Sequence, residues 1–207
     1  PLWPQRPANG RCEVVCFTSD HNASFGSLPV SRVRTVIEAW ADRTAELSAM
    51  PGIEQVFPFE NRGQEIGVTL QHPHGQIYGY PFDAVRRDRI PDAGIEIACG
   101  SQRLIGAQQT GHGRIAERKA GSRVVIDGEH WTAFVPAAAR WPVEAHLVPH
   151  RAVPDMAGLD DAERDELAVV YRELLHRLER ATGQRDPAVR VRALTRLFVE
   201  FATEDPV

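Results

Sequence analysis

The sequence predicts an α+β fold in which an antiparallel sheet packs against helices. Two observations support this fold class. Residues 1–82 show a strand pattern, then a helical pattern, then several more strand patterns. The second half resembles it loosely, as strands followed by a helix. Strands that come in groups, instead of alternating with single helices, are typical of α+β folds with antiparallel sheets.

The first half begins with a strand and a long amphipathic helix. Residues 12–17 form a short β-branched apolar run, which predicts a strand. Apolar residues recur every three or four positions over 31–50, so we expect a helix there, with Ser31 as its N-cap and Pro51-Gly52 as its stop. Further strands are predicted at 53–59, 66–70 and 76–80, with turns at 60–63 and 72–75.

The second half follows a long segment without a sustained hydrophobic period, residues 83–118, which is interpreted as a connection. Strands are then predicted at 123–126, 131–135 and 144–148, with a hairpin turn at Asp127-Gly128. Asp160 and Glu163 predict a capping box that opens a helix ending at Gly183, and a last helix is expected over 187–201. The predicted division is a first domain over 1–82, a divergent connection over 83–118 and a partial second domain over 119–207.

The composition is that of an ordinary globular protein and excludes several functional classes. Of the 207 residues, 43% are hydrophobic and 25% are charged, which excludes a disordered chain, a collagen-like repeat and a coiled coil. The 24 basic and 28 acidic residues give a net charge of −4, which argues against nucleic acid or a membrane as a partner. The longest apolar runs are too short to span a bilayer. Three cysteines are an odd number and form no disulfide framework, so a cytoplasmic location is expected.

The segment Gln71-His-Pro-His-Gly-Gln-Ile-Tyr78 carries the strongest indication of chemistry. Side chains alternate along an extended backbone, which the intervening proline favours, so His72 and His74 point to the same side. Gly75 leaves room for a phosphate near the backbone, and Gln76 offers amide donors. A neutral imidazole is abundant at pH 7 and attacks phosphorus without prior deprotonation. Taken alone, a His-x-His segment is more often a surface turn.

The surroundings of this segment closely resemble the active-site region of the galactose-1-phosphate uridylyltransferases, a family of the histidine-triad superfamily. The resemblance covers residues 9–82 and 121–180. It is carried by FENRG at 59–63, GVTLQHPHGQIY at 67–78, GRCEVVCF at 10–17, SDH at 19–21, GEHW at 128–131, FVP at 134–136, RWP at 140–142 and LDD at 159–161. It implies a histidine-triad-like antiparallel sheet with packed helices, and a first domain followed by part of a second, similar domain.

By its position, His74 resembles the nucleophile of this family. The resemblance implies that His74 attacks the α-phosphorus of UDP-glucose, expels glucose 1-phosphate and forms a covalent uridylyl-histidine. Galactose 1-phosphate then takes up the uridylyl group and leaves as UDP-galactose. Gln76 matches the residue whose amide binds a nonbridging phosphoryl oxygen, while Asn61, Gly67 and Thr69 match contacts to the nucleotide.

A structural zinc ion is the cofactor that the resemblance implies. His21 and His72 match two histidine ligands of the family's zinc site, and neutral imidazole is a common zinc ligand. The other two ligands often come from a Cys-x-x-Cys pair near the N-terminus, which this sequence lacks. Zinc is therefore expected to be incompletely ligated or absent, unless an upstream segment supplies the thiolates. Cys12 and Cys16 are interpreted as core thiols on the first predicted strand, and zinc binding by them is the alternative.

Parts of the family pattern are not found in this sequence. A further His-x-His pair of a second metal site and late residues that hold the hexose phosphate are absent, and residues 83–118 and 181–207 depart from the pattern. The chain starts at Pro1 without a methionine, so a piece incomplete at both ends is expected. The implied partners are UDP-glucose, galactose 1-phosphate and either a second copy of the chain, as a homodimer, or a complementing upstream fragment.

Three functions remain open from the sequence. The leading one is a UDP-glucose–hexose-1-phosphate uridylyltransferase of galactose metabolism. The others are another histidine-triad nucleotidyltransferase and a non-catalytic remnant that binds nucleotide or zinc. The spacing from Asn61 to Gln76 favours the first function, whereas the absent family segments favour the third.

Overall fold

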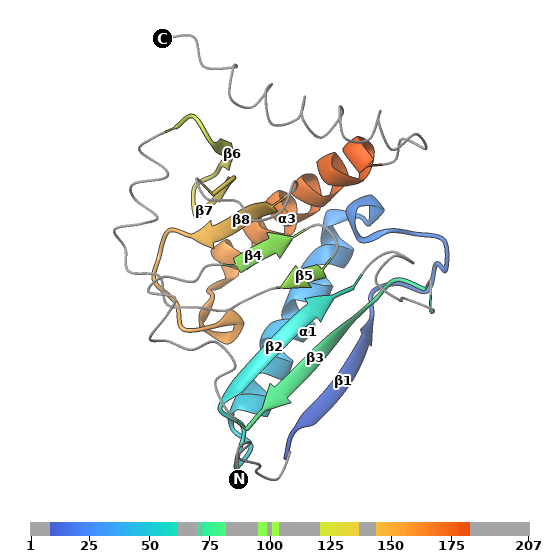
Figure 1. The fold of residues 1–207 in the computed structure, drawn as a ribbon, viewed down its shortest axis with the longest axis vertical. Coiled ribbons are helices and arrows are strands. Elements are labelled where there is room, and N and C mark those ends of the chain that lie inside the picture. The colour runs from blue at the N-terminus through green and yellow to red at the C-terminus, as the bar shows by residue number, and fades with distance from the viewer. Residues whose placement is uncertain are drawn as a thin grey trace, which may run out of the picture.

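The computed structural model describes residues 9–61, 70, 72–81, 95–98, 101–103, 121–136 and 144–182. Among them, eight strands form one sheet in the order β1-β3-β2-β5-β4-β8-β7-β6, and all neighbouring strands are antiparallel (Figure 1). The strands are β1 (Arg11–Cys16), β2 (Gln55–Glu60), β3 (His74–Tyr80), β4 (Ile95–Ala98), β5 (Ser101–Arg103), β6 (Val124–Asp127), β7 (Trp131–Phe134) and β8 (Glu144–Pro149). The helical elements are η1 (Phe25–Ser27), α1 (Val30–Ser48), η3 (Met156–Gly158) and α3 (Asp161–Thr182). The predicted α+β class with an antiparallel sheet is confirmed.

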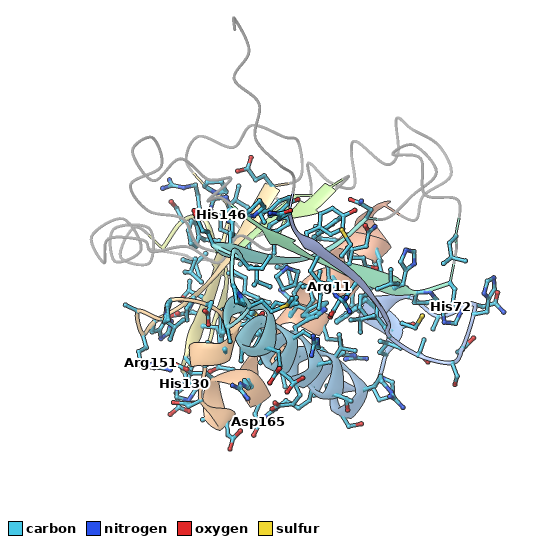
Figure 2. All side chains as sticks on the ribbon, turned by 90° about the horizontal axis from the view of Figure 1, so that it is seen from below. Arg11, His72, His130, His146, Arg151 and Asp165 are labelled. Atoms are coloured by element: carbon cyan, nitrogen blue, oxygen red, sulfur yellow. The ribbon has the colours of Figure 1, made fainter. Side chains whose placement is uncertain are left out.

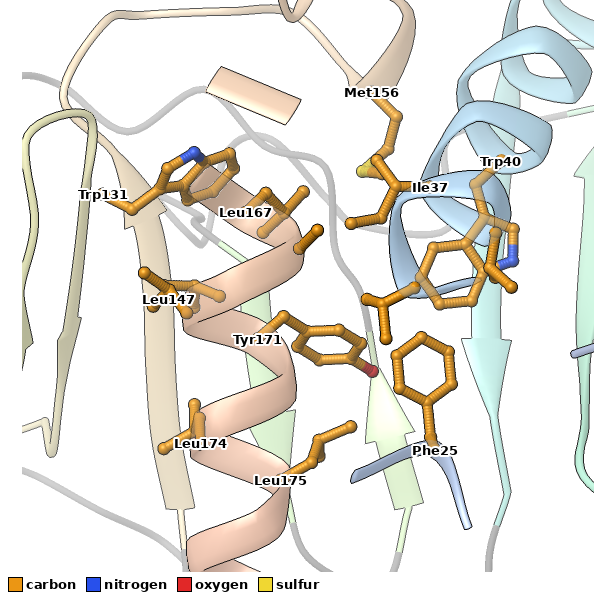
Figure 3. Packing of buried hydrophobic residues seen from close by; sticks show 14 of the residues in the cluster. Phe25, Ile37, Trp40, Trp131, Leu147, Met156, Leu167, Tyr171, Leu174 and Leu175 are labelled. Atoms are coloured by element: carbon orange, nitrogen blue, oxygen red, sulfur yellow. The ribbon is translucent and has the colours of Figure 1, made fainter. Parts of the chain in front are cut away.

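The core lies between the two long helices and one face of the sheet (Figure 2). Aromatic rings join the two halves of the chain there: Phe25 stacks on Trp40 of α1 and meets the ring of Tyr171 of α3 edge-on, at centroid distances of 5.8 and 5.1 Å (Figure 3). The apolar stripes predicted for both helices are buried, namely Val33, Val36, Ile37, Trp40, Thr44 and Leu47 in α1, and Leu167, Val170, Tyr171, Leu174, Leu175 and Leu178 in α3.

Two of the predicted helix ends are confirmed and one is wrong. At α3 the predicted capping box is confirmed, since the Asp160 N–H donates to the Glu163 carboxylate and the Glu163 N–H donates to the Asp160 carboxylate, both at 2.9 Å. At α1 the prediction of Ser31 as N-cap is wrong. The Pro29 carbonyl accepts the first helical hydrogen bonds, so Pro29 is the N-cap and Ser31 lies inside the first turn. The Pro51-Gly52 stop is confirmed, with Gly52 at a φ of 83°.

The interpretation of residues 83–118 as a connection is wrong for two short pieces of it. β4 and β5 pair with each other and join the sheet between β2 and β8. Strands of four and three residues are too short to show a hydrophobic period, and their other partners, β2 and β8, are distant in sequence. β4 and β5 therefore join the strands of the first half and those of the second half into one continuous sheet. The domain boundaries at 82 and 119 stay predictions.

The remaining strand predictions are confirmed, with shifted ends, wherever the structure describes them. β3 begins at His74, so the second histidine belongs to a strand and not to the preceding turn. Of the strand expected at 66–70, only Leu70 is described, and it lies outside the strands. The turn at 60–63 and the helix at 187–201 fall wholly or largely outside the described residues.

Strand β1 corrects the interpretation of Cys12 and Cys16 as core thiols. Both are exposed and free. β1 is an edge strand whose Glu13 turns to α1 and forms a two-point ion pair with Arg43 at 2.7 and 3.0 Å. The cysteines alternate with Glu13, so they face the other side of the sheet, as does Val14, which is 64% exposed. Even spacing placed the two thiols on one face, but the helices cover the opposite face.

No helix among the described residues combines the length and the apolar character that crossing a bilayer requires.

Candidate active site

The two faces of β3 differ in burial and in residue type. Gly75, Ile77 and Gly79 are buried and turn to the helices, with Ile77 at 0% exposure in the core cluster. A Cβ atom on Gly75 would lie 2.7 Å from the Phe17 ring. Gly75 therefore makes room for a core ring, whereas the sequence suggested that it makes room for a phosphate. The alternate residues, among them His74 and Gln76, are half-buried on the face that the helices leave open.

His74 is held by the backbone two residues before it. Its Nδ1 lies 2.7 Å from the carbonyl oxygen of His72. A carbonyl oxygen only accepts hydrogen bonds, so Nδ1 carries the proton in this contact. In the neutral imidazole, Nε2 then carries the lone pair. The hydrogen bond therefore fixes both the orientation of the ring and the atom that can act as a nucleophile.

Gln76 lies two residues further along the same face and is held by a second hydrogen bond. The Tyr78 hydroxyl donates to its side-chain carbonyl Oε1 at 2.8 Å. When Oε1 accepts this bond, the amide NH2 group is the end of the side chain that can donate to another molecule. Consecutive residues on one face of a strand have Cα atoms about 6.6 Å apart, which is within reach of one phosphoryl group.

The strands beside β3 place further predicted residues next to His74. Cys16 of β1 is the registered partner of His74. On the other side, Phe59 of β2 is the partner of Gln76, so Asn61, two residues beyond it, lies at the His74 end of β2. Asn61 is half-buried. Gly67 and Thr69 lie outside the described residues.

His72 and His21 lie side by side at the end of the β1–β3 pairing. The Nε2 of His72 lies 2.8 Å from the Thr18 carbonyl oxygen and so donates to it, which leaves the lone pair of the neutral ring on Nδ1. That Nδ1 lies 3.3 Å from the Nδ1 of His21. Two nitrogen ligands about 2.0–2.1 Å from a tetrahedral zinc ion lie about 3.3–3.4 Å apart. The pair thus fits two ligands of such an ion, and it equally fits a hydrogen bond between the rings.

No group of three or more metal-ligating side chains occurs among the described residues. Of the residues predicted to bind zinc, His21 and His72 lie together in the described part of the chain.

The loop that carries His21 is anchored by the helix of the second half. Glu179 of α3 accepts a hydrogen bond from the Ser24 hydroxyl at 2.8 Å and from the Gly26 N–H at 3.4 Å. The Arg172 guanidinium donates to the Leu28 carbonyl at 2.7 Å. Residues distant in sequence therefore help to fix the segment between His21 and α1.

Two histidines of the second half, His146 and His150, contact other residues of its strands and turns. The His150 ring contacts the Thr132 hydroxyl and the Glu129 carbonyl, both at 2.8 Å, and His146 contacts the buried Glu144 at 3.1 Å. His146 lies far from His72 (Figure 2). These contacts agree with a structural role for these histidines.

The arrangement on β3 can support nucleophilic substitution at phosphorus. An oriented imidazole offers Nε2 to an electrophile, and an oriented amide offers N–H donors to the negative charge that develops on its oxygen atoms. Sequence reasoning found both groups but did not identify Tyr78. The alternation that places Gln76 beside His74 also places Tyr78 on that face, and this is the signal that indicates it.

Comparisons with known proteins place both halves of the chain in one family. The family model described as "Galactose-1-phosphate uridyl transferase, N-terminal domain" matches residues 1–83, and the corresponding C-terminal domain matches residues 100–182. The chain is 52% identical over 179 residues to the galactose-1-phosphate uridylyltransferase of Streptomyces lividans, covering 86% of this chain and 49% of that protein. It is 35% identical over 182 residues to the enzyme of the same name from Thermotoga maritima, covering 87% and 55%.

A solved structure described as that of uridylyltransferase matches with a TM-score of 0.67 and 27% sequence identity, covering 83% of this chain and 53% of that chain. A galt-like protein from Arabidopsis thaliana matches with a TM-score of 0.65 at 16% identity, which supports the fold alone. The chain spans about half the length of the curated relatives it matches. Two consecutive domain models, two close relatives and a solved structure agree, and the chain belongs to the galactose-1-phosphate uridylyltransferase family.

Proposed function

We propose that this chain transfers a uridylyl group from UDP-glucose to galactose 1-phosphate through a covalent uridylyl-histidine on His74. The observation that carries the proposal is the 2.7 Å contact between His74 Nδ1 and the His72 carbonyl, because it leaves the lone pair on Nε2. Family membership supports the same reaction, since relatives at 52% and 35% identity bear the name of this enzyme.

The reaction proceeds in two displacements. The Nε2 lone pair of His74 attacks the phosphorus next to uridine, a nitrogen–phosphorus bond forms, and the bond to the bridging oxygen breaks. The bonding electrons leave with glucose 1-phosphate. A phosphate oxygen of galactose 1-phosphate then attacks the same phosphorus, the nitrogen–phosphorus bond breaks, and UDP-galactose leaves. Division of one transfer into two steps through an enzyme-bound intermediate gives ping-pong kinetics.

The residues around His74 serve this chemistry in different ways. The Gln76 amide donates to a nonbridging oxygen of the transferred phosphoryl group and stabilises its charge in the transition state. Asn61, at the His74 end of β2, contacts the nucleotide. Gly67 and Thr69 are proposed nucleotide contacts on the strength of the sequence resemblance alone.

We also propose that His21 and His72 hold a structural zinc ion together with ligands from outside the described residues. The fit rests on the Nδ1–Nδ1 distance of 3.3 Å and on the Thr18 contact that leaves the His72 lone pair on Nδ1. A zinc ion bound there ties the loop after β1 to the residue whose carbonyl orients His74. The histidine pair thereby supports the nucleophile without taking part in the chemical step.

Further proposals concern the protein's partners and location. A second copy of the chain, or a fragment that supplies the rest of the length of the relatives, is the proposed protein partner. The free thiols of Cys12 and Cys16 support a reducing cytoplasmic location.

Incubation of the chain with UDP-glucose that carries 32P at the phosphate next to uridine tests the proposed activity. The expected result is acid-labile, base-stable label on the protein, because a phosphorus–nitrogen bond hydrolyses in acid. The label must be absent in His74→Ala and must leave as UDP-galactose when galactose 1-phosphate is added.

The same experiment separates the alternatives. Wild-type protein that takes no label but binds uridine monophosphate supports a non-catalytic nucleotide-binding protein. Label that transfers to another phosphate acceptor, and not to galactose 1-phosphate, supports a different histidine-triad nucleotidyltransferase. Equal label on wild type and His74→Ala contradicts the assignment of the nucleophile.

A further inference from the structure

Tyr78 lies on the open face of β3 and has no role in the reaction proposed above. Its hydroxyl donates to Oε1 of Gln76 at 2.8 Å. Both residues lie on the face that carries His74, and both are half-buried. The hydroxyl thus contacts the one side chain that is proposed to donate to the transferred phosphoryl group.

The Tyr78 ring is itself held in place. It meets the Phe59 ring edge-on, with a centroid distance of 4.9 Å and an interplanar angle of 87°. It meets Tyr80 in the same manner at 5.9 Å and 74°. Phe59 is buried and is the registered strand partner of Gln76. Contacts on two sides fix the ring, so the position of the hydroxyl is set before any substrate arrives.

A glutamine amide needs such a partner in order to act as a dependable donor. The amide can turn by half a rotation and present either its NH2 group or its carbonyl oxygen to a bound phosphate. A carbonyl oxygen beside a phosphoryl oxygen is repulsive, and free rotation of the side chain must be lost on binding. A donor on Oε1 holds the orientation that directs NH2 to the phosphate, and it polarises the amide so that its N–H groups donate more strongly.

We infer that Tyr78 is a positioning residue for uridylyl transfer, because its hydroxyl holds the Gln76 amide with the NH2 group directed to the phosphoryl group attacked by His74. This inference rests on the proposed function. Tyr78 touches neither the substrate nor the reacting atoms in this account and acts through Gln76 alone. Its effect must therefore depend on the presence of the Gln76 amide.

A double-mutant cycle tests this dependence through the rate at which the labelled uridylyl group appears on His74. In the wild-type background, Tyr78→Phe is expected to slow labelling about 3- to 10-fold, the effect of one lost neutral hydrogen bond. The KM for UDP-glucose should stay within about twofold, because the contact matters most when charge develops. In the Gln76→Ala background, Tyr78→Phe should change the rate by less than about twofold.

Tyr80→Phe is the matched control. It removes the same hydroxyl group from the same strand and face, two residues further from His74. The Tyr80 ring that contacts Tyr78 is kept, so the labelling rate should be unchanged. Thermal unfolding must show that all variants are folded. Equal slowing by Tyr78→Phe in both backgrounds, or no slowing in either, overturns the inference.

Failure of the proposed function is recognised separately, because wild-type protein then takes no label at all. In that case the side-chain amide resonances of Gln76 decide the inference. Nuclear magnetic resonance of 15N-labelled protein should show these resonances moving in Tyr78→Phe and not in Tyr80→Phe. Resonances that are the same in wild type and Tyr78→Phe contradict the contact itself.

Discussion

The two faces of β3 are held by different interactions. On the covered face, the Phe17 ring and the helices limit the space for the side chains at positions 75 and 77, which are Gly75 and Ile77. On the open face, hydrogen bonds orient the side chains. His74 donates to a carbonyl oxygen at 2.7 Å, and Gln76 accepts from a hydroxyl at 2.8 Å. Because side chains alternate along a strand, one face of β3 can serve stability while the other face serves chemistry. Substitutions on the two faces should therefore affect different measurements.

The largest effect is expected from His74→Asn. The asparagine amide can keep a donor near the Nδ1 position, so the bond to the His72 carbonyl survives while Nε2 is removed. Uridylyl transfer should fall by more than about 10⁴-fold, as for the loss of a catalytic nucleophile. Thermal unfolding should stay cooperative. Loss of that cooperativity would mean that His74 is needed for the fold.

Gln76→Ala should follow on the same face. The loss of one donor to developing charge is expected to slow the chemical step about 10²–10³-fold. Single-turnover labelling with saturating UDP-glucose measures this step. An unchanged rate would mean that Gln76 does not act in the chemical step.

On the covered face, Gly75→Ala should change stability first. The added Cβ meets the Phe17 ring at 2.7 Å and the Phe59 carbonyl oxygen at 3.0 Å. Overpacking of this kind costs about 1–3 kcal/mol in the free energy of unfolding. Urea unfolding measures that loss, and isothermal titration of the folded variant with uridine monophosphate should show an unchanged Kd. Weaker nucleotide binding with unchanged stability would instead assign Gly75 to phosphate approach.

The smallest effect concerns Glu13, which faces the helices from β1. The hydrogen bond from Arg43 lowers the pKa of Glu13 below its ordinary value of 4.5, against an opposing effect of burial. Because the folded pKa lies below the unfolded one, the stabilisation is complete well above pH 4.5 and is lost as pH falls through the folded pKa.

Glu13→Gln should therefore cost about 0.5–1.5 kcal/mol at pH 7, the size of one net hydrogen bond. The difference from wild type should shrink as the pH falls below 4.5, whereas uridylyl transfer at pH 7 should not change. Urea unfolding at several pH values provides the measurement, and a difference that grows in acid would contradict the sign.

The sequence predicted those parts of the fold that depend on local pattern. The stripes of both helices and the capping box at Asp160 and Glu163 are confirmed because they follow from spacing within one helix. The strands β4 and β5 were missed because they are short and because, apart from each other, their pairing partners are the distant strands β2 and β8. Cys12 and Cys16 were placed on one face correctly, but which face the helices cover depends on tertiary packing.

The candidate site shows the same limit. The sequence indicated His74 and Gln76 and their shared face, because alternation along a strand is a local property. It did not indicate that Gly75 serves Phe17, since Gly75 lies in β3 whereas Phe17 follows β1, far away in sequence. Nor did spacing show which nitrogen of His74 carries the lone pair, which depends on the His72 carbonyl in the folded chain.

The central claim is that His74 reacts through Nε2 because Nδ1 is bonded to the His72 carbonyl. Nuclear magnetic resonance of 15N-histidine-labelled protein after reaction with UDP-glucose tests it directly, since coupling to phosphorus identifies the bonded nitrogen. We expect a single uridylyl group on Nε2 of His74. A group on Nδ1, on another residue or on none would contradict it.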